Sequence, residues 1–168
     1  MQLTRPAHPR KPRVTMALPP TWTLFGDDHL PHRLQLLARM IDRESARQLA
    51  EQSGLTLAEW RVLAYAGSSE RTSAAEICAA FDVDRAEVSR AVARLVEAGL
   101  LRREPDEANR KRMMLALTDP GRVLYQETRT RRVDYFRQIL APLDPAERER
   151  FDEMLRRVAL KVDELKGC

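Results

Sequence analysis

The chain has 168 residues, a net charge of +4 and 43% hydrophobic residues, which fits one domain or a compact two-part protomer. No run approaches the roughly 20 apolar residues of a transmembrane helix, and no apolar signal-peptide core lies near the start. We therefore expect a cytoplasmic protein without a membrane partner. The chain has two cysteines, Cys78 and Cys168, which argues against a disulfide framework.

The positive net charge comes from the N-terminal tail. Residues 1–13 carry basic residues and no acidic one, whereas bases and acids balance in the rest of the chain. Repeated prolines within residues 1–20 oppose a regular helix, so we predict a basic, disordered tail there. That tail is either a solvated segment or an arm that grips DNA. A translation start at Met16 would remove most of it.

Two helices are predicted before the central motif. The first spans about 30–52, and its apolar stripe is too long for a helix that stands free in water. The second spans 55–66, where Thr56 and Glu59 form a capping box. We expect the core side chains of this second helix to be Trp60, Val62, Leu63 and Tyr65.

The central motif is a predicted helix-turn-helix over residues 72–99. Its first helix opens at Ser73 with Glu76 in the capping-box position, and the turn is 81–83. Asp84 caps the second helix, and Gly99 favours a left-handed end. One face of this second helix is apolar and the other carries Arg85, Ser89, Arg90 and Arg94. A polar, arginine-bearing helix braced by a preceding helix suits insertion into a DNA major groove.

A two-stranded hairpin is predicted directly after the motif. The strands cover 100–103 and 112–117, and turn-forming residues lie between them. The basic residues at and just after the tip are Arg110, Lys111 and Arg112. A hairpin with a cationic tip beside a recognition helix is a wing, and its arginine can enter the minor groove.

Two further helices close the chain. Thr118 caps one that starts near Pro120 and ends near Leu140, and Asp144 opens the last, with Pro145 next. One stripe of the last helix is apolar: Phe151, Met154, Leu155, Val158, Val162 and Leu165. No later segment of this sequence can cover that stripe. We therefore expect the first helix and the last two to pack together and against a second copy, giving a homodimer.

The segment from Leu55 to Gly121 resembles the winged helix-turn-helix of the MarR family of bacterial transcription regulators. The matching stretches are LTLAEWRVLAYAG, VDRAEVSRAVARLVEAGLLRR, DEANRKR and LTDPG. The flanking helices fit as well, so the resemblance extends over roughly residues 25–166. The family's wing has Asp followed by Asp-Arg-Arg, whereas this chain has Asp106 followed by Asn109-Arg110-Lys111. That change removes a charge that could orient the wing arginine.

The resemblance implies a mainly α fold with a small β-hairpin wing (α+β), in which the N- and C-terminal helices form a dimerisation domain. We accordingly expect a disordered tail over 1–20, a helical dimerisation domain from 21–54 and 119–168, and a winged helix-turn-helix DNA-binding domain over 55–118. In a two-fold dimer the recognition helices would lie about one DNA turn apart on a pseudo-palindromic, double-stranded operator.

Seven residues are predicted to contact DNA. Arg85 and Ser89 lie where the recognition helix reaches base edges, whereas Arg90 and Arg94 suit phosphates. In the wing, Arg110 is the minor-groove candidate, with Lys111 and Arg112 as phosphate partners. Each of these side chains could instead pair with an acid of its own surface.

The resemblance also implies a small-molecule effector, commonly an aromatic acid, bound where the dimer helices meet the DNA-binding lobe. A carboxylate needs a cation or a directed donor there, and a ring needs an apolar wall. The candidates are His29, His32, Arg33, Trp60 and Arg61. The alternative interpretation is that Trp60 belongs to the core and that the histidines are surface residues.

No catalytic or metal-binding motif is recognisable. HExxH, CxxC and a glycine-rich phosphate loop are all absent from the sequence, so we expect no enzyme activity, metal or cofactor. Cys78 is expected to be a small core residue.

We expect a repressor of an aromatic-acid catabolic or resistance operon, released by a small aromatic carboxylate or phenolic acid such as a methoxybenzoate or hydroxycinnamate. Two alternatives remain: a ligand-independent activator or architectural DNA-binding protein, and a winged-helix protein-interaction module.

Overall fold

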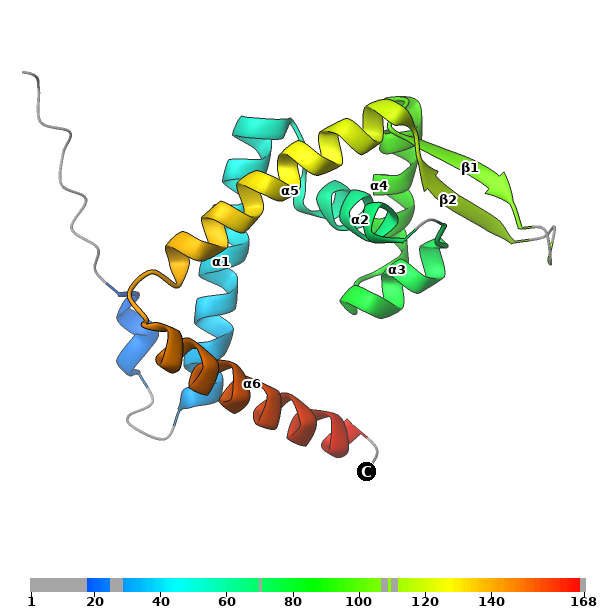
Figure 1. The fold of residues 1–168 in the computed structure, drawn as a ribbon. Coiled ribbons are helices and arrows are strands. Elements are labelled where there is room, and N and C mark those ends of the chain that lie inside the picture. Colours follow the sequence, from blue (N-terminus) through cyan, green and yellow to red (C-terminus); the bar gives the residue numbers. More distant parts are fainter. Residues whose placement is uncertain (1–17, 25–28, 70, 107–108, 110–111, 167–168) are drawn as a thin grey trace, which may run out of the picture. The chain divides into compact units, whose positions relative to one another are not determined.

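The computed structural model describes residues 18–24, 29–69, 71–106, 109 and 112–166. The chain divides into two compact units, Met1–Glu44 and Ser45–Cys168, and the boundary falls inside the first long helix. The predicted roles of Arg110, Lys111 and Cys168 and most of the predicted tail lie outside the described residues. Figure 1 shows the elements in chain order: η1 (Pro20–Thr23), α1 (Leu30–Ser53), α2 (Leu57–Ser68), α3 (Ala74–Phe81), α4 (Arg85–Glu97), β1 (Leu101–Pro105), β2 (Met113–Leu117), α5 (Asp119–Ile139) and α6 (Pro145–Lys166).

Capping side chains set the starts of the helices, as predicted. Thr56 and Glu59 form the capping box of α2, and Ser73 and Glu76 form that of α3. Because an N-cap residue stands outside the helix that it caps, α2 begins at Leu57, and the predicted start at Leu55 is wrong. The same reasoning gives α6 its start, where Asp144 and Glu147 exchange hydrogen bonds of 2.9 Å each.

The turn between α3 and α4 depends on one left-handed residue. Asp82 has a φ of 49°, and its backbone N–H donates to the carbonyl of Cys78. Asp84 then caps α4 by accepting from the backbone N–H groups of Ala86 at 2.7 Å and Glu87 at 3.1 Å. Gly99 ends the helix segment with a φ of 69°, a conformation in which a side chain would be strained.

The wing is an antiparallel hairpin in which Leu101 pairs with Leu117 and Arg103 with Leu115. The predicted strand boundaries are slightly wrong. Leu100 closes the end of the preceding helix by donating to the carbonyl of Leu95, so β1 starts one residue later than predicted. Arg112 belongs to the turn because its N–H donates to the carbonyl of Asn109.

The second unit has one hydrophobic core, which lies among α2, α3, α4 and the wing strands. Its fully buried members include Val62, Leu63, Ile77 and Leu95. Trp60 and Tyr65 are only partly buried and pack against that core, so they are less central than predicted. Cys78 packs there too, partly buried and with a free thiol. The recognition helix and both strands of the wing therefore share this core.

Polar contacts join the C-terminal end of α1 to α5. Arg132 is only 7% exposed, donates to the Ser45 hydroxyl at 2.9 Å and lies over the ring of Phe136, 4.5 Å from its centroid. Ser53 and Thr128 share a hydrogen bond of 3.1 Å between their hydroxyls. Arg132 of α5 thus makes an interhelical contact with α1.

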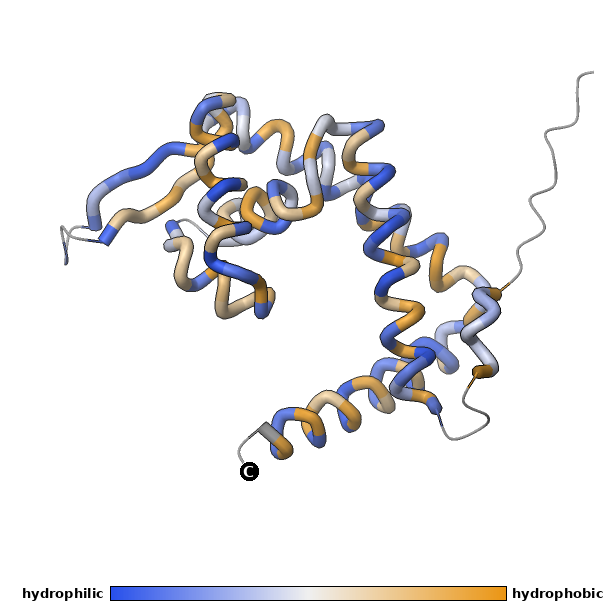
Figure 2. The backbone as a smooth tube through the Cα atoms, turned by 180° about the vertical axis from the view of Figure 1, so that it is seen from behind, coloured by the Kyte–Doolittle hydropathy of each residue, from blue (hydrophilic) through white to orange (hydrophobic). Residues whose placement is uncertain are grey.

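The apolar stripe of α6 is exposed in the single chain. Figure 2 shows hydrophobic positions recurring along this helix between charged ones. Exposed fractions are 54% for Met154, 47% for Val158 and 52% for Val162. Within the described residues, no helix is long and apolar enough to span a membrane.

Candidate nucleic-acid interface

The recognition helix α4 buries one face and presents the other to solvent. Val88, Val92 and Leu95 are each at most 3% exposed. Arg85, Ser89 and Arg90 are exposed on the opposite side. Within the described part of the chain, none of these three polar side chains has a hydrogen-bond or ion-pair partner. The face is therefore open to a polar ligand.

Arg94, the fourth predicted contact on α4, is tied to α2. Its Nε donates to Oε1 of Glu59 at 2.5 Å, and the Glu59 side chain is only 10% exposed. Glu59 also accepts from the N–H and the hydroxyl of Thr56, at 2.7 and 2.8 Å. The Arg94 side chain is still 52% exposed, so its outer N–H groups face solvent.

The surroundings of Glu59 favour its charged form. Burial alone would raise the pKa of this carboxyl, but hydrogen bonds from the Thr56 N–H, Arg94 and the Thr56 hydroxyl outweigh it and lower the pKa. A second ion pair of reversed polarity joins the same two helices, because Arg61 of α2 lies 3.8 Å from Glu87 of α4. Two ion pairs thus link α2 and α4 at their surface.

The base of the wing is anchored to α3 and to the segment before it. Thr72 and Leu115 exchange two backbone hydrogen bonds, of 3.1 and 2.6 Å. Arg112 donates through Nη2 to Glu76 at 2.6 Å and to the Ser73 hydroxyl at 3.1 Å. The hydrogen bonds to Glu76, first that of the Ser73 N–H, hold the pKa of its carboxyl below the ordinary value.

The wing and the recognition helix meet at a cavity of about 430 Å³. Its lining comes from the start of α3, the start of α4 and the wing: Ser73, Ala74, Ala75, Arg85, Asn109, Arg112 and Met113. The structure thus brings together Arg85 and Arg112, two predicted DNA contacts from different elements. A hollow lined by two guanidinium groups suits an anion such as a DNA phosphate.

The predicted effector residues lie in two separate units. His29, His32 and Arg33 are in the first unit, where the Arg33 Nε donates to the carbonyl of Trp22 at 3.1 Å. Trp60 and Arg61 are in the second. Trp60 stacks on Tyr125 with ring centroids 6.1 Å apart and packs against the core, which matches the alternative interpretation given for it.

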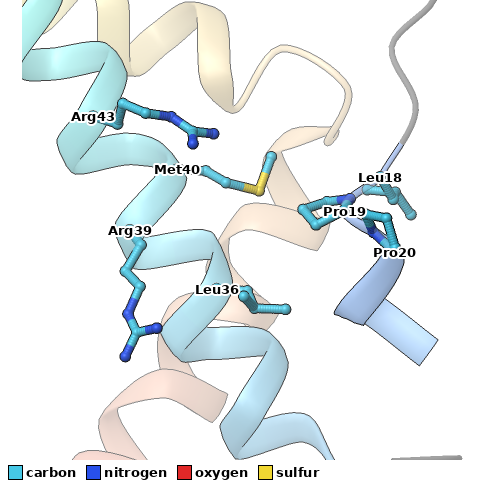
Figure 3. A pocket seen from close by; sticks show the side chains of 7 residues that line it. All are labelled: Leu18, Pro19, Pro20, Leu36, Arg39, Met40 and Arg43. Atoms are coloured by element: carbon cyan, nitrogen blue, oxygen red, sulfur yellow. The ribbon is translucent and has the colours of Figure 1, made fainter. Parts of the chain in front are cut away.

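The first unit has a cavity that the sequence did not predict. Its volume is about 530 Å³, and it is lined by Leu18, Pro19, Pro20, Leu36, Arg39, Met40 and Arg43 (Figure 3). The predicted tail was too long at its C-terminal end, because Pro20 begins η1, where its fixed φ suits a helix start. The basic pair one turn apart on the first helix was the available signal for this cavity.

The sequence analysis also missed the ion pairs of Glu59 and Glu76. Both residues were recognised only as members of capping boxes. Their second partners, Arg94 and Arg112, are 35 and 36 positions away, so no local pattern indicates them. Among the described residues, no group of three or more His, Cys, Asp or Glu side chains could hold a metal ion.

Comparison with known proteins agrees with this geometry. Residues 53–112 match the MarR family model. An uncharacterized HTH-type transcriptional regulator of Bacillus subtilis, YwoH, is 27% identical over 132 residues, which cover 79% of this chain and 95% of that protein.

Solved structures share the fold. A MarR/EmrR family regulator from Acinetobacter superposes with a TM-score of 0.73 at 24% identity, covering 81% of this chain and 96% of the other. A second match is BpsR of Bordetella bronchiseptica, whose DNA binding is regulated by 6-hydroxynicotinic acid. It is 26% identical with a TM-score of 0.59, and the match covers 73% of this chain and 98% of BpsR. With the helix-turn-helix, the anchored wing and these matches in place, residues 53–112 of this chain are a winged helix-turn-helix of the MarR family of transcriptional regulators.

Proposed function

We propose that this regulator is a homodimeric repressor that leaves its operator when a small aromatic acid binds. The observation that carries the DNA-binding part is the cavity shared by Arg85 of α4 and Arg112 of the wing. It joins the recognition helix and the wing into one cationic surface. Such a surface can engage the major groove and the neighbouring backbone together.

Different side chains take different parts of the DNA. Arg85 and Ser89, near the N-terminus of α4, read base edges. Arg90 and the outer N–H groups of Arg94 bind phosphates, and Arg112 holds a phosphate at the wing base. Arg110 enters the minor groove and Lys111 takes a phosphate beside it.

The dimer is built from the terminal helices. The exposed stripe of α6 has the spacing of a helix that packs on another helix, and a second copy supplies the missing partner. Residues 21–54 and 119–168 then form the dimerisation domain and 55–118 the DNA-binding domain. Two copies of α4 would face successive turns of a pseudo-palindromic operator.

The effector acts by population shift. An acid that binds the DNA-incompetent form more tightly releases the operator, and its effect is limited by that difference in affinity. The relative BpsR, regulated by 6-hydroxynicotinic acid, supports a hydroxylated aromatic acid as the chemical class. His29, His32 and Arg33 of the first unit stay candidates for contacts to its carboxylate or phenol, and Trp60 and Arg61 of the second unit stay candidates for contacts to its ring.

The test is an electrophoretic shift of the purified protein on the DNA upstream of its own coding region. The same duplex is titrated with salicylate, 4-hydroxybenzoate, ferulate and 6-hydroxynicotinate. Release by one acid is the expected result and identifies the effector class. Binding that survives all four acids points instead to a ligand-independent DNA-binding protein. Absence of any shift at low salt favours a protein-interaction module.

A further inference from the structure

The cavity of the first unit lies between two apolar walls, one formed by α1 and the other by the prolines that precede it. Leu36 and Met40 stand one turn apart on α1 and point toward Pro19 and Pro20 (Figure 3). The proline rings are rigid, whereas the thioether of Met40 can adapt its shape to a ligand. A flat ring between these two walls would be covered on both of its faces.

Two arginines contribute positive charge to this cavity. Arg39 and Arg43 line it from successive turns of α1. In Figure 3, Arg43 extends over Met40, whereas the guanidinium group of Arg39 points away from the prolines. In the described part of the chain, neither arginine has a hydrogen-bond or ion-pair partner. By contrast, Arg47 on the next turn donates to both oxygens of Glu51, at 2.9 and 2.8 Å.

An apolar slot beside unmatched arginines complements an anion that carries a ring. Guanidinium groups bind carboxylates with paired, charge-assisted hydrogen bonds, which are among the stronger polar contacts in proteins. The volume of about 530 Å³ falls within the range of small-molecule sites. An inorganic anion would leave the apolar walls unused.

The geometry points to this cavity as the binding site of the aromatic carboxylate effector. The ring lies between Met40 and the two prolines, and the carboxylate accepts from Arg43, with the positive charge of Arg39 one turn away on the same helix. This inference rests on the proposed function, since it takes from there the class of the ligand. It assigns the carboxylate to different cations from the predicted His32 and Arg33, neither of which lines the cavity.

The experiment compares matched arginine variants of the full chain. Binding of salicylate and 6-hydroxynicotinate is measured by calorimetry, and release of the upstream duplex by fluorescence anisotropy. Arg39→Gln/Arg43→Gln removes both charges from the cavity, and Arg47→Gln removes one charge from the same helix outside it. His32→Ala/Arg33→Gln tests the residues predicted from sequence. Thermal melting without acid verifies that each variant is folded.

We expect the Arg39/Arg43 variant to bind the acid at least about tenfold more weakly, as loss of a charge-assisted contact implies, and to need correspondingly more acid for release. The Arg47 variant should match the wild type. An unchanged response in the Arg39/Arg43 variant, with a loss only in the His32/Arg33 variant, would overturn this site while leaving the ligand-released repressor intact.

Two further outcomes also count against the site. A wild-type protein that binds DNA but none of the acids would overturn both the site and the ligand part of the proposed function. A shift of the Arg39/Arg43 variant from dimer to monomer in size-exclusion chromatography, with an unchanged acid affinity, would mean that a second copy occupies the cavity.

Discussion

Arg112, at the base of the wing, donates a hydrogen bond of 2.6 Å to Glu76, the capping-box glutamate of α3. The same nitrogen donates to the hydroxyl of Ser73 at 3.1 Å. One carboxylate therefore caps a helix and anchors the wing to it. This contact ties the wing to the helix-turn-helix. The two strands of the wing form the only sheet among the described residues.

Replacing Arg112 by Gln should loosen the wing, because the ion pair to Glu76 is lost while the capping box stays in place. Hydrogen exchange of the backbone amides in β1 and β2 should become faster, and the affinity for the upstream duplex should fall. Arg103→Gln on β1 is the matched control for hydrogen exchange. Equal protection of the strands in both variants would count against the anchor.

Arg85 and Arg90 should separate base reading from phosphate binding. Arg85→Ala should cost about 1–3 kcal/mol on the preferred duplex and less on a scrambled one, since a base contact carries sequence information. Arg90→Ala should weaken binding to both duplexes alike. It should also reduce the slope of log affinity against log salt concentration by about 1. Binding measured at several salt concentrations decides between the two roles, and the reverse pattern would exchange the assignments.

Glu59 should make stability depend on pH in the acidic range. Its pKa is lowered in the folded state, so its contribution is present above the ordinary glutamate pKa of about 4.3 and is lost as pH falls through the lower folded value. Glu59→Gln should lower the free energy of unfolding at neutral pH by about 1–3 kcal/mol. Denaturant unfolding between about pH 6 and about pH 3 should show a smaller decrease in the free energy of unfolding for the variant than for the wild type. An equal decrease in both proteins would contradict the role of the Arg94 and Thr56 contacts.

Gly121 should tolerate no side chain. A Cβ built there would overlap the carbonyl oxygen of Leu100, which is backbone and cannot rotate away. That oxygen also accepts from the Thr118 N–H at 3.2 Å, so the junction between wing and α5 would have to shift. Gly121→Ala should destabilise the protein by about 1–3 kcal/mol, measured by thermal melting. Arg122→Ala, at the exposed neighbouring position, is the control and should have little effect.

Two equally exposed residues of α6 test the proposed dimer. Val158 is 47% exposed on the apolar stripe, whereas Leu160 is 53% exposed and lies off it. Val158→Glu should convert the dimer to a monomer by placing a charge in the interface, and DNA affinity should fall with it. Leu160→Glu should remain dimeric in analytical ultracentrifugation. Equal behaviour of the two variants would argue that the stripe is not the interface.

Most of the fold could be predicted from local signals. Thr56, Ser73, Asp84 and Thr118 mark helix starts because each cap acts on amides within three residues of itself. Boundaries were less predictable where two elements compete for one residue. Leu100 could extend a strand, but its N–H closes the helix end instead.

The candidate site was only partly predictable, since it depends on distant pairs. The pattern of α4 indicates which arginines face outward. It does not indicate that Glu59 holds Arg94 or that Glu76 holds Arg112, because those contacts exist only after folding. The cavity of the first unit was missed for the same reason, as its walls meet only when the segment before α1 packs on the helix.

The most direct test of the account is a salt titration of binding to duplexes selected from a randomised library. We predict a palindromic consensus, two protein copies per duplex and a steep loss of affinity with rising salt, because several phosphates are contacted. The Arg90→Ala/Arg110→Ala variant should lose this binding. Selection of no consensus, or equal binding by that variant, would contradict the claim that α4 and the wing form the DNA-reading surface.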